Sequence, residues 1–112
     1  MQYEEEDLPT LKRTLTVKKR NFTRQYNACG KATAFATAHP TPDAAESVRN
    51  CQQRMTKAYG ELTDILTTIQ VRDDVKEFDN YEGTLQDTQD KYEGAEERII
   101  ACLEELLSLI HI

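Results

Sequence analysis

The last third of the chain repeats its apolar residues at an interval of seven. The residues at this interval are Phe78, Leu85, Tyr92, Ile99 and Leu106, and a second set follows three residues after the first four: Tyr81, Thr88, Ala95 and Cys102. This pattern is typical of a helix that packs along its length against other helices. A single helix of this kind would leave its apolar stripe in water. The rest of the chain must therefore supply helices that cover it.

The middle of the chain carries a second stripe of the same kind, formed by Val48, Met55, Leu62 and Ile69 together with Cys51, Ala58 and Ile65. Thr41 and Pro42 are a typical start signal, because a threonine side chain caps a helix and proline fits the first helical position. We expect this helix to span residues 42–70. Gly60 interrupts good helix-forming sequence, and we interpret it as the mark of a close crossing.

The first helix is expected over residues 8–39. Pro9 is tolerated only in a first turn, so the helix begins near it. His39 precedes Pro40, and a residue before proline is pushed out of the helical conformation. One face of this segment is apolar and is formed by Leu8, Leu11, Leu15, Phe22, Tyr26 and Cys29.

The boundary between the second and third helices is indicated by register alone. Continuing the second stripe would place Lys76 in the core, whereas the third stripe requires Phe78. We expect a tight turn with Asp73 or Asp74 as the cap, and a third helix over residues 74–108. The alternative is one continuous helix with a discontinuity in the repeat. The turn predicts an all-α fold, an elongated antiparallel three-helix bundle of coiled-coil type, with the first and third helices parallel.

A chain of 112 residues forms one domain at most. We expect an acidic tail over residues 1–7 and a single helical-bundle domain over residues 8–106. The last residues, 107–112, read Leu-Ser-Leu-Ile-His-Ile and resemble the translated read-through of a sequencing adapter. In that interpretation they are not native, and the native chain continues differently. The alternative is an ordinary apolar helix end.

Charge is strongly segregated along the chain. Residues 8–42 carry seven basic residues and no acidic one, although the whole chain has a net charge of -6. The candidate site residues are six of these seven bases: Lys12, Arg13, Lys18, Lys19, Arg20 and Arg24. Two roles are open for them. They dock the first helix against the acidic third helix, or they bind an external polyanion such as nucleic acid.

Nothing in the sequence resembles an active site. His39 and His111 stand alone, and no metal-binding, nucleophile or phosphate-loop motif is present. Cys29, Cys51 and Cys102 are widely spaced and odd in number, which favours buried thiols in a reducing compartment. Tyr59, Tyr81 and Tyr92 are expected at the edge of the core. We therefore expect no enzyme, cofactor, metal or small-molecule substrate.

No apolar run approaches the roughly 20 residues that a membrane span requires. The acidic N-terminal segment lacks the basic flank and apolar centre of a secretory signal. We therefore expect no membrane association and an intracellular, cytoplasmic location.

The chain resembles the N-terminal region of Gag-like polyproteins from BEL/Pao-type retrotransposons. The resemblance covers about residues 8–106 and begins with the basic helix from Leu11 to Arg24. A second helix follows with an arginine, an aromatic residue and an acid, which are Arg54, Tyr59 and Glu61. An acidic turn comes next, at Asp73 and Asp74. The final segment leads to Ile99 and begins with Phe78, Asp79, Asn80, Tyr81 and Glu82. The resemblance implies a non-enzymatic structural fragment. The catalytic parts of such polyproteins lie further downstream.

These observations predict a helical domain for interaction with protein, including a second copy of itself. Two alternatives stay open: a cellular helical-bundle adaptor unrelated to retroelements, and a nucleic-acid-binding module that uses the basic first helix.

Overall fold

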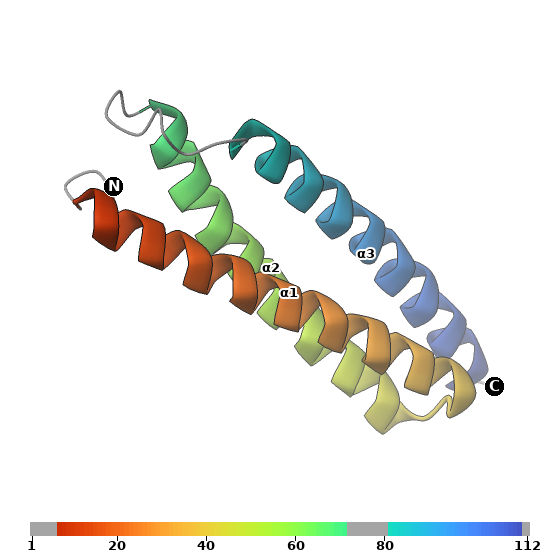
Figure 1. Cartoon of the computed structure of the whole chain (residues 1–112). Helices are drawn as coiled ribbons and strands as arrows, with labels where there is room; N and C mark the ends of the chain where they lie inside the picture. The colour runs from red at the N-terminus through yellow and green to blue at the C-terminus, as the bar shows by residue number, and fades with distance from the viewer. Residues whose placement is uncertain (1–6, 72–80, 111–112) are drawn as a thin grey trace.

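A computed structural model describes residues 7–71 and 81–110 of the chain. Within these residues it contains three helices and no strand: α1 (Leu8–Ala38), α2 (Pro42–Val71) and α3 (Tyr81–Ile110) (Figure 1). All three helices contact one another, and the molecule measures 58 by 19 by 19 Å. The prediction of an elongated all-α three-helix bundle is confirmed.

The start of α1 follows from its capping residues. The Asp7 side chain accepts a hydrogen bond from the backbone N–H of Thr10 at 3.0 Å, and Pro9 lies in the first turn. This hydrogen bonding with Thr10 lowers the pKa of the exposed Asp7 carboxyl below its ordinary value. The helix ends one residue earlier than expected, at Ala38, where His39 leaves the helical conformation.

The start of α2 uses the cap that the sequence indicates. The Thr41 hydroxyl accepts a hydrogen bond from the backbone N–H of Ala44 at 3.1 Å, and Pro42 is the first helical residue. The helix ends at Val71, one residue beyond the expected bound. The expected start of the third helix at residue 74, its Asp73 or Asp74 cap and the stripe residue Phe78 lie outside the described residues.

The core lies along the three predicted stripes. Every stripe residue of α2 is buried, and α2 also buries Ala44, Ala45, Leu66 and Thr68. Among the described side chains of the two other helices, the buried residues are Leu11, Phe22, Cys29, Ala36, Thr88, Ala95, Ile99 and Leu106. Leu15, Tyr26, Leu85, Tyr92 and Cys102 are partly buried against them. The seven-residue repeat therefore identified the inward faces correctly.

Side-chain contacts define the direction of each helix pair. Between α2 and α3, Gln52 reaches Glu96 and Thr56 reaches Tyr92. The residue number rises on α2 as it falls on α3, so these two helices run antiparallel.

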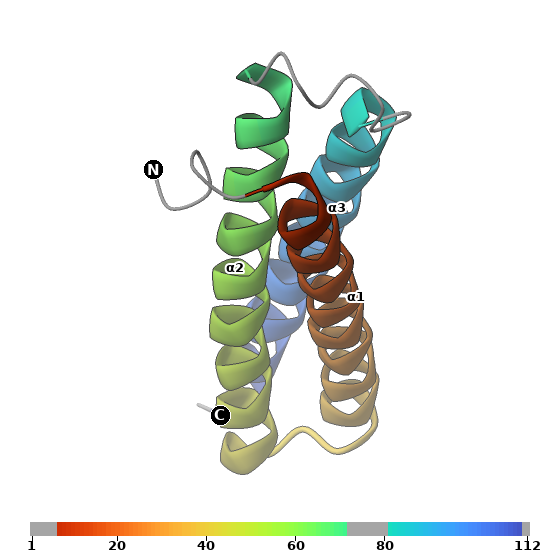
Figure 2. The same cartoon turned by 60° about the vertical axis from the view of Figure 1, so that its left-hand side comes forward.

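The same reasoning gives the direction of α1. Lys18 and Phe22 meet Glu61 and Tyr59 of α2, so these two helices are antiparallel. The Arg98 guanidinium donates to the Tyr26 hydroxyl, and the Cys102 thiol lies 3.9 Å from the Thr33 carbonyl. Here the residue numbers rise together, so α1 and α3 are parallel, as Figures 1 and 2 also show.

Because α2 and α3 pack side by side, the alternative of one continuous helix through both is wrong. The close crossing expected at Gly60 is also wrong. Gly60 is exposed, and a Cβ atom added there would meet nothing within 4 Å.

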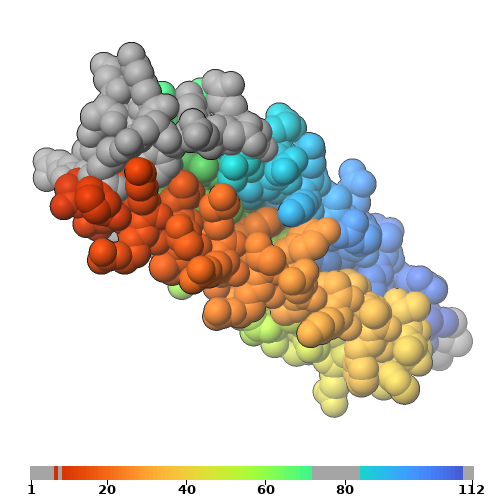
Figure 3. Space-filling view, viewed as in Figure 1, coloured from red at the N-terminus to blue at the C-terminus, as the bar shows by residue number. Residues whose placement is uncertain are grey.

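The space-filling view shows α1 as a ridge along one side of the bundle, with α3 beside it (Figure 3).

Candidate interaction surfaces

Hollows in the described part of the bundle range in volume from about 10 Å³ to about 430 Å³. Among the described residues, no group of three or more His, Cys, Asp or Glu side chains is placed to hold a metal ion. A cavity beside Tyr26, Cys29 and Ile99 has a volume of about 10 Å³, which is room for one water molecule. None of the helices in the described part of the chain is both long enough and apolar enough to cross a membrane.

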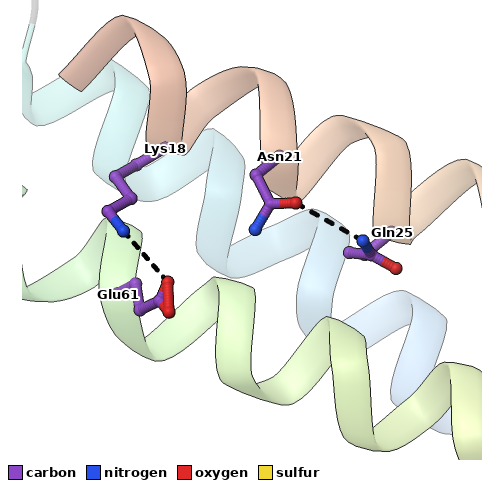
Figure 4. A network of polar contacts seen from close by, with 4 residues as sticks. All are labelled: Lys18, Asn21, Gln25 and Glu61. Carbon is purple, nitrogen blue, oxygen red and sulfur yellow. Dashed lines mark hydrogen bonds and ion pairs between the residues drawn. The ribbon is translucent and has the colours of Figure 1, made fainter. Parts of the chain in front are cut away.

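The six predicted site residues separate into two groups. Lys18 is half-buried, and its ammonium lies 3.1 Å from the Glu61 carboxylate of α2 (Figure 4). Beside it, the Gln25 amide donates to the Asn21 side chain at 3.4 Å along α1. The other five are exposed: Lys12, Arg13, Lys19, Arg20 and Arg24. The ion pair of Lys18 therefore joins α1 to α2.

Four exposed bases of α1 lie in a straight stripe on the side facing away from the core: Arg13, Arg20, Arg24 and Lys31. We call this stripe the cationic face; it consists of Arg13, Val17, Arg20, Arg24, Asn27 and Lys31, all exposed. The spacing alternates between four and three residues, which keeps the side chains on one face of a helix. No acidic residue lies anywhere in α1. The face therefore presents a single sign of charge along most of the helix.

A matching stripe of opposite charge lies on α3. We call it the acidic face; it consists of Asp90, Glu93, Glu97, Ile100 and Glu104, all exposed. Its spacing alternates between three and four residues. Asp90 accepts a hydrogen bond from Gln86 within the same helix. Ile100 is 49% exposed and sits between two carboxylates.

Four aromatic residues gather where the three helices meet. The Tyr59 and Tyr92 rings stack with centroids 4.0 Å apart and an interplanar angle of 3°. The Phe22 ring lies 6.2 Å from both Tyr26 and Tyr59. The Tyr92 hydroxyl hydrogen-bonds to Thr56 at the surface. Tyr59 and Tyr92 thus lie at the core edge, as expected, whereas the side chain of Tyr81 is outside the described part.

The three cysteines are free thiols inside the bundle. Cys29 and Cys51 are buried and Cys102 is half-buried. Burial raises the pKa of the Cys29 thiol to about 11, and the neighbouring Cys51 thiol adds to this shift. The Arg54 guanidinium donates to the Cys51 sulfur at 3.3 Å. The expectation of buried thiols is confirmed for Cys29 and Cys51.

Comparison with known proteins gives no relative: no protein-family model, no curated protein and no solved structure matches this chain. The assignment of function therefore depends on the surfaces of the bundle itself.

Several residues of these surfaces were missed by the sequence reasoning. Val17, Lys31, Ile100 and Glu104 complete the two charged faces, yet the basic cluster and the acidic run were read only as charge. The signal that could have identified them was the position of each repeat around its helix. Each face repeats with the same heptad spacing as the core stripe of its helix, displaced to the opposite side.

Proposed function

We propose that this chain is a non-enzymatic helical interaction domain that associates with copies of itself through its helix faces. The observation that carries the proposal is the pair of outward faces of opposite charge on α1 and α3. Each chain carries both members of a complementary pair. The apolar stripes of the three helices are already covered by one another, whereas the charged faces lie exposed on the outside of the bundle.

The burial of individual side chains supports this assignment. Arg20 and Arg24 are exposed, and no described side chain forms an ion pair or hydrogen bond with either of them. The same holds for Glu93 and Glu97 on α3. Exposed charges of one sign raise the rate of encounter with a surface of opposite sign and suppress wrong partners.

The origin that we propose is the N-terminal part of a Gag-like structural polyprotein. The support is the resemblance in the basic first helix, the Arg54, Tyr59 and Glu61 set, and the segment leading to Ile99. A reverse transcriptase downstream in the same reading frame is the expected genomic context. An isolated cellular gene in that position would instead favour the alternative of a helical-bundle adaptor.

Sedimentation velocity tests the self-association directly. We expect the sedimentation coefficient to rise with protein concentration at low salt and to rise less at high salt, because salt screens exposed charges over roughly 8–10 Å. A monomer at every concentration and salt level would contradict the proposal.

The cationic face also favours a second candidate, a nucleic-acid-binding module. From Arg13 to Lys31 this face extends about 27 Å along the helix. Phe22 is only 3% exposed, so nucleotide bases cannot stack on its ring, and the arginine and lysine side chains of this face supply phosphate contacts.

The expected result for this second candidate is RNA binding that weakens steeply with salt and is lost in the variant Arg20→Glu/Arg24→Glu. The matched control is Arg49→Glu/Lys57→Glu, which reverses two exposed bases of α2. Equal binding by both variants would exclude the cationic face as the RNA site.

A further inference from the structure

The two charged faces have mirrored spacing. On the cationic face, Val17 has Arg13 four residues before it and Arg20 three residues after it. On the acidic face, Ile100 has Glu97 three residues before it and Glu104 four residues after it. The order of the two intervals is reversed, and reversed intervals coincide when two helices run antiparallel.

We propose that the cationic face of α1 in one copy packs antiparallel against the acidic face of α3 in a second copy, with Val17 opposite Ile100. This inference rests on the proposed self-association and names the surface that performs it. The register then places each arginine of the face opposite a glutamate, and the pairs are Arg13 with Glu104, Arg20 with Glu97, and Arg24 with Glu93. Asn27 falls opposite Asp90.

The apolar pair distinguishes this register from others. Val17 is 54% exposed and Ile100 is 49% exposed, so each is a single apolar side chain within a charged stripe. In the antiparallel register they cover each other from water while the charges pair around them. The parallel arrangement with the same apolar pair would place Arg20 opposite Leu103 and Arg24 opposite Leu107, which leaves the charges unmatched.

The contact has to form between copies. Within one chain, the Tyr26–Arg98 and Thr33–Cys102 contacts fix the relative height of α1 and α3. These contacts place Val17 beside residues 86–89 of its own α3. Ile100 lies at least 11 residues further along that helix, which is about 16 Å or more. The antiparallel register also cannot form within one copy, because its α1 and α3 run parallel.

The contact is heterologous, because it joins one face of a copy to a different face of the next. After one contact, the first copy still has its acidic face unused and the second its cationic face, so the association continues into a closed ring or an open assembly. A single pair of helices buries little surface, and exposed ion pairs contribute little individually. The association is therefore weak per contact and sensitive to salt.

Charge reversal tests the pairing. The variants Arg20→Glu/Arg24→Glu and Glu93→Arg/Glu97→Arg should each weaken self-association by about tenfold or more in sedimentation velocity. An equimolar mixture of the two should associate again, because each variant then meets the charge it lacks. The control Arg49→Glu/Lys57→Glu should associate like the wild type, since both bases lie on α2 away from the two faces. Circular dichroism verifies that every variant keeps its helices.

Cross-linking tests the register. A mixture of Val17→Cys and Ile100→Cys chains should form a disulfide between copies under a mild oxidant. A mixture of Val17→Cys and Gln86→Cys chains should not, because Gln86 lies 14 residues, or about 21 Å, from the expected partner position.

The outcomes separate the surface from the self-association itself. If the wild type associates and the two charge-reversed variants associate equally well, the proposed surface is wrong while self-association stands. If the wild type is monomeric, both proposals fail. If the mixture of reversed variants does not recover, the α1–α3 pairing is overturned. If only RNA binding responds to Arg20→Glu/Arg24→Glu, the pairing is overturned in favour of the nucleic-acid role.

Discussion

The inner and outer stripes of α3 repeat with the same helical spacing, but the inner stripe is buried and the outer stripe is exposed. The inner stripe contains Ile99, which is 1% exposed, and the outer stripe contains Ile100, which is 49% exposed. These neighbours are the same residue type on the same helix. The repeat therefore establishes the helix, and the residues that share a stripe decide whether that stripe enters the core. Thr88, Ala95 and Leu106 accompany Ile99 inward, whereas carboxylates surround Ile100.

The largest expected difference between the two stripes is in the loss of stability when each isoleucine is replaced by aspartate. Ile99→Asp should destabilise the fold by several kcal/mol, because it places an unpaired carboxylate in the core. Ile100→Asp should change the free energy of unfolding by less than about 1 kcal/mol, and Glu97→Lys on the same outer face by about 0.5 kcal/mol or less. Urea unfolding followed by circular dichroism measures all three. Equal losses for the two isoleucines would mean that the inner stripe is not buried.

The buried Cys29 thiol of α1 makes the stability of the fold depend on pH. The Cys29 pKa is raised to about 11 in the fold, by burial first and then by the charge interaction with Cys51, against an ordinary value of 9.0. The unfolded thiol ionises first as pH rises. The stabilisation is therefore complete below pH 9 and is lost between about pH 9 and pH 11, by roughly 2 to 3 kcal/mol.

Urea unfolding at pH 8, 9, 10 and 11 measures this loss. Arg54 of α2 and Glu96 of α3 also act on this thiol and partly oppose each other. The control Cys29→Ala removes the thiol but keeps every other group that titrates in this range, so its stability should fall less steeply. Parallel curves for Cys29→Ala and wild type would show that Cys29 is not the cause.

The outer side of α2 allows a gain in stability. Gly60 is exposed in the middle of a helix, and a Cβ atom there has open space around it. Gly60→Ala should stabilise the bundle by about 0.5–1 kcal/mol, because alanine loses less backbone freedom on folding. Gly94→Ala is the matched variant on α3. There the added Cβ would lie 3.5 Å from the Arg98 guanidinium, which is an ordinary contact. A loss of stability at Gly60 alone would indicate a close neighbour after all.

The sequence was sufficient for the fold because the signals are local and periodic. Thr41, Pro42 and the His39–Pro40 pair act within a few residues, so two helix ends were predicted to within one residue. The core stripes of α2 required only the seven-residue count. The reading of Gly60 failed because a glycine in a helix does not reveal whether another helix passes near it.

The candidate surfaces were less predictable because they depend on which helix lies beside which. The sequence identified the basic residues of α1 but did not show which of their side chains point toward another helix and which toward solvent. Lys18 turns toward Glu61 of α2, while Arg20 and Arg24 point to solvent. Charge composition is the same in both situations. Only the three-dimensional arrangement shows that most of the positive charge of α1 stays outside the bundle.

The smallest expected effect concerns the boundary between inner and outer stripes, where Lys18 meets Glu61. Their side chains are 27% and 31% exposed, so water screens the ion pair. A double-mutant cycle with Lys18→Ala and Glu61→Ala should give a coupling below about 1 kcal/mol, and high salt should reduce it. Arg24→Ala, an exposed residue, should be close to neutral.

Interhelix docking by charge stays a prediction for the six basic residues. Each exposed pair contributes only about 0–1 kcal/mol, so the summed field of these residues, and no single pair, would direct where α1 packs. The replacement of Lys12, Lys18, Lys19 and Arg24 by Glu would then expose α1 to hydrogen exchange while α2 and α3 stayed protected. A weak coupling with α1 equally protected would assign its docking to Leu11, Phe22 and Cys29. The outer charges would then be left for contacts with other molecules.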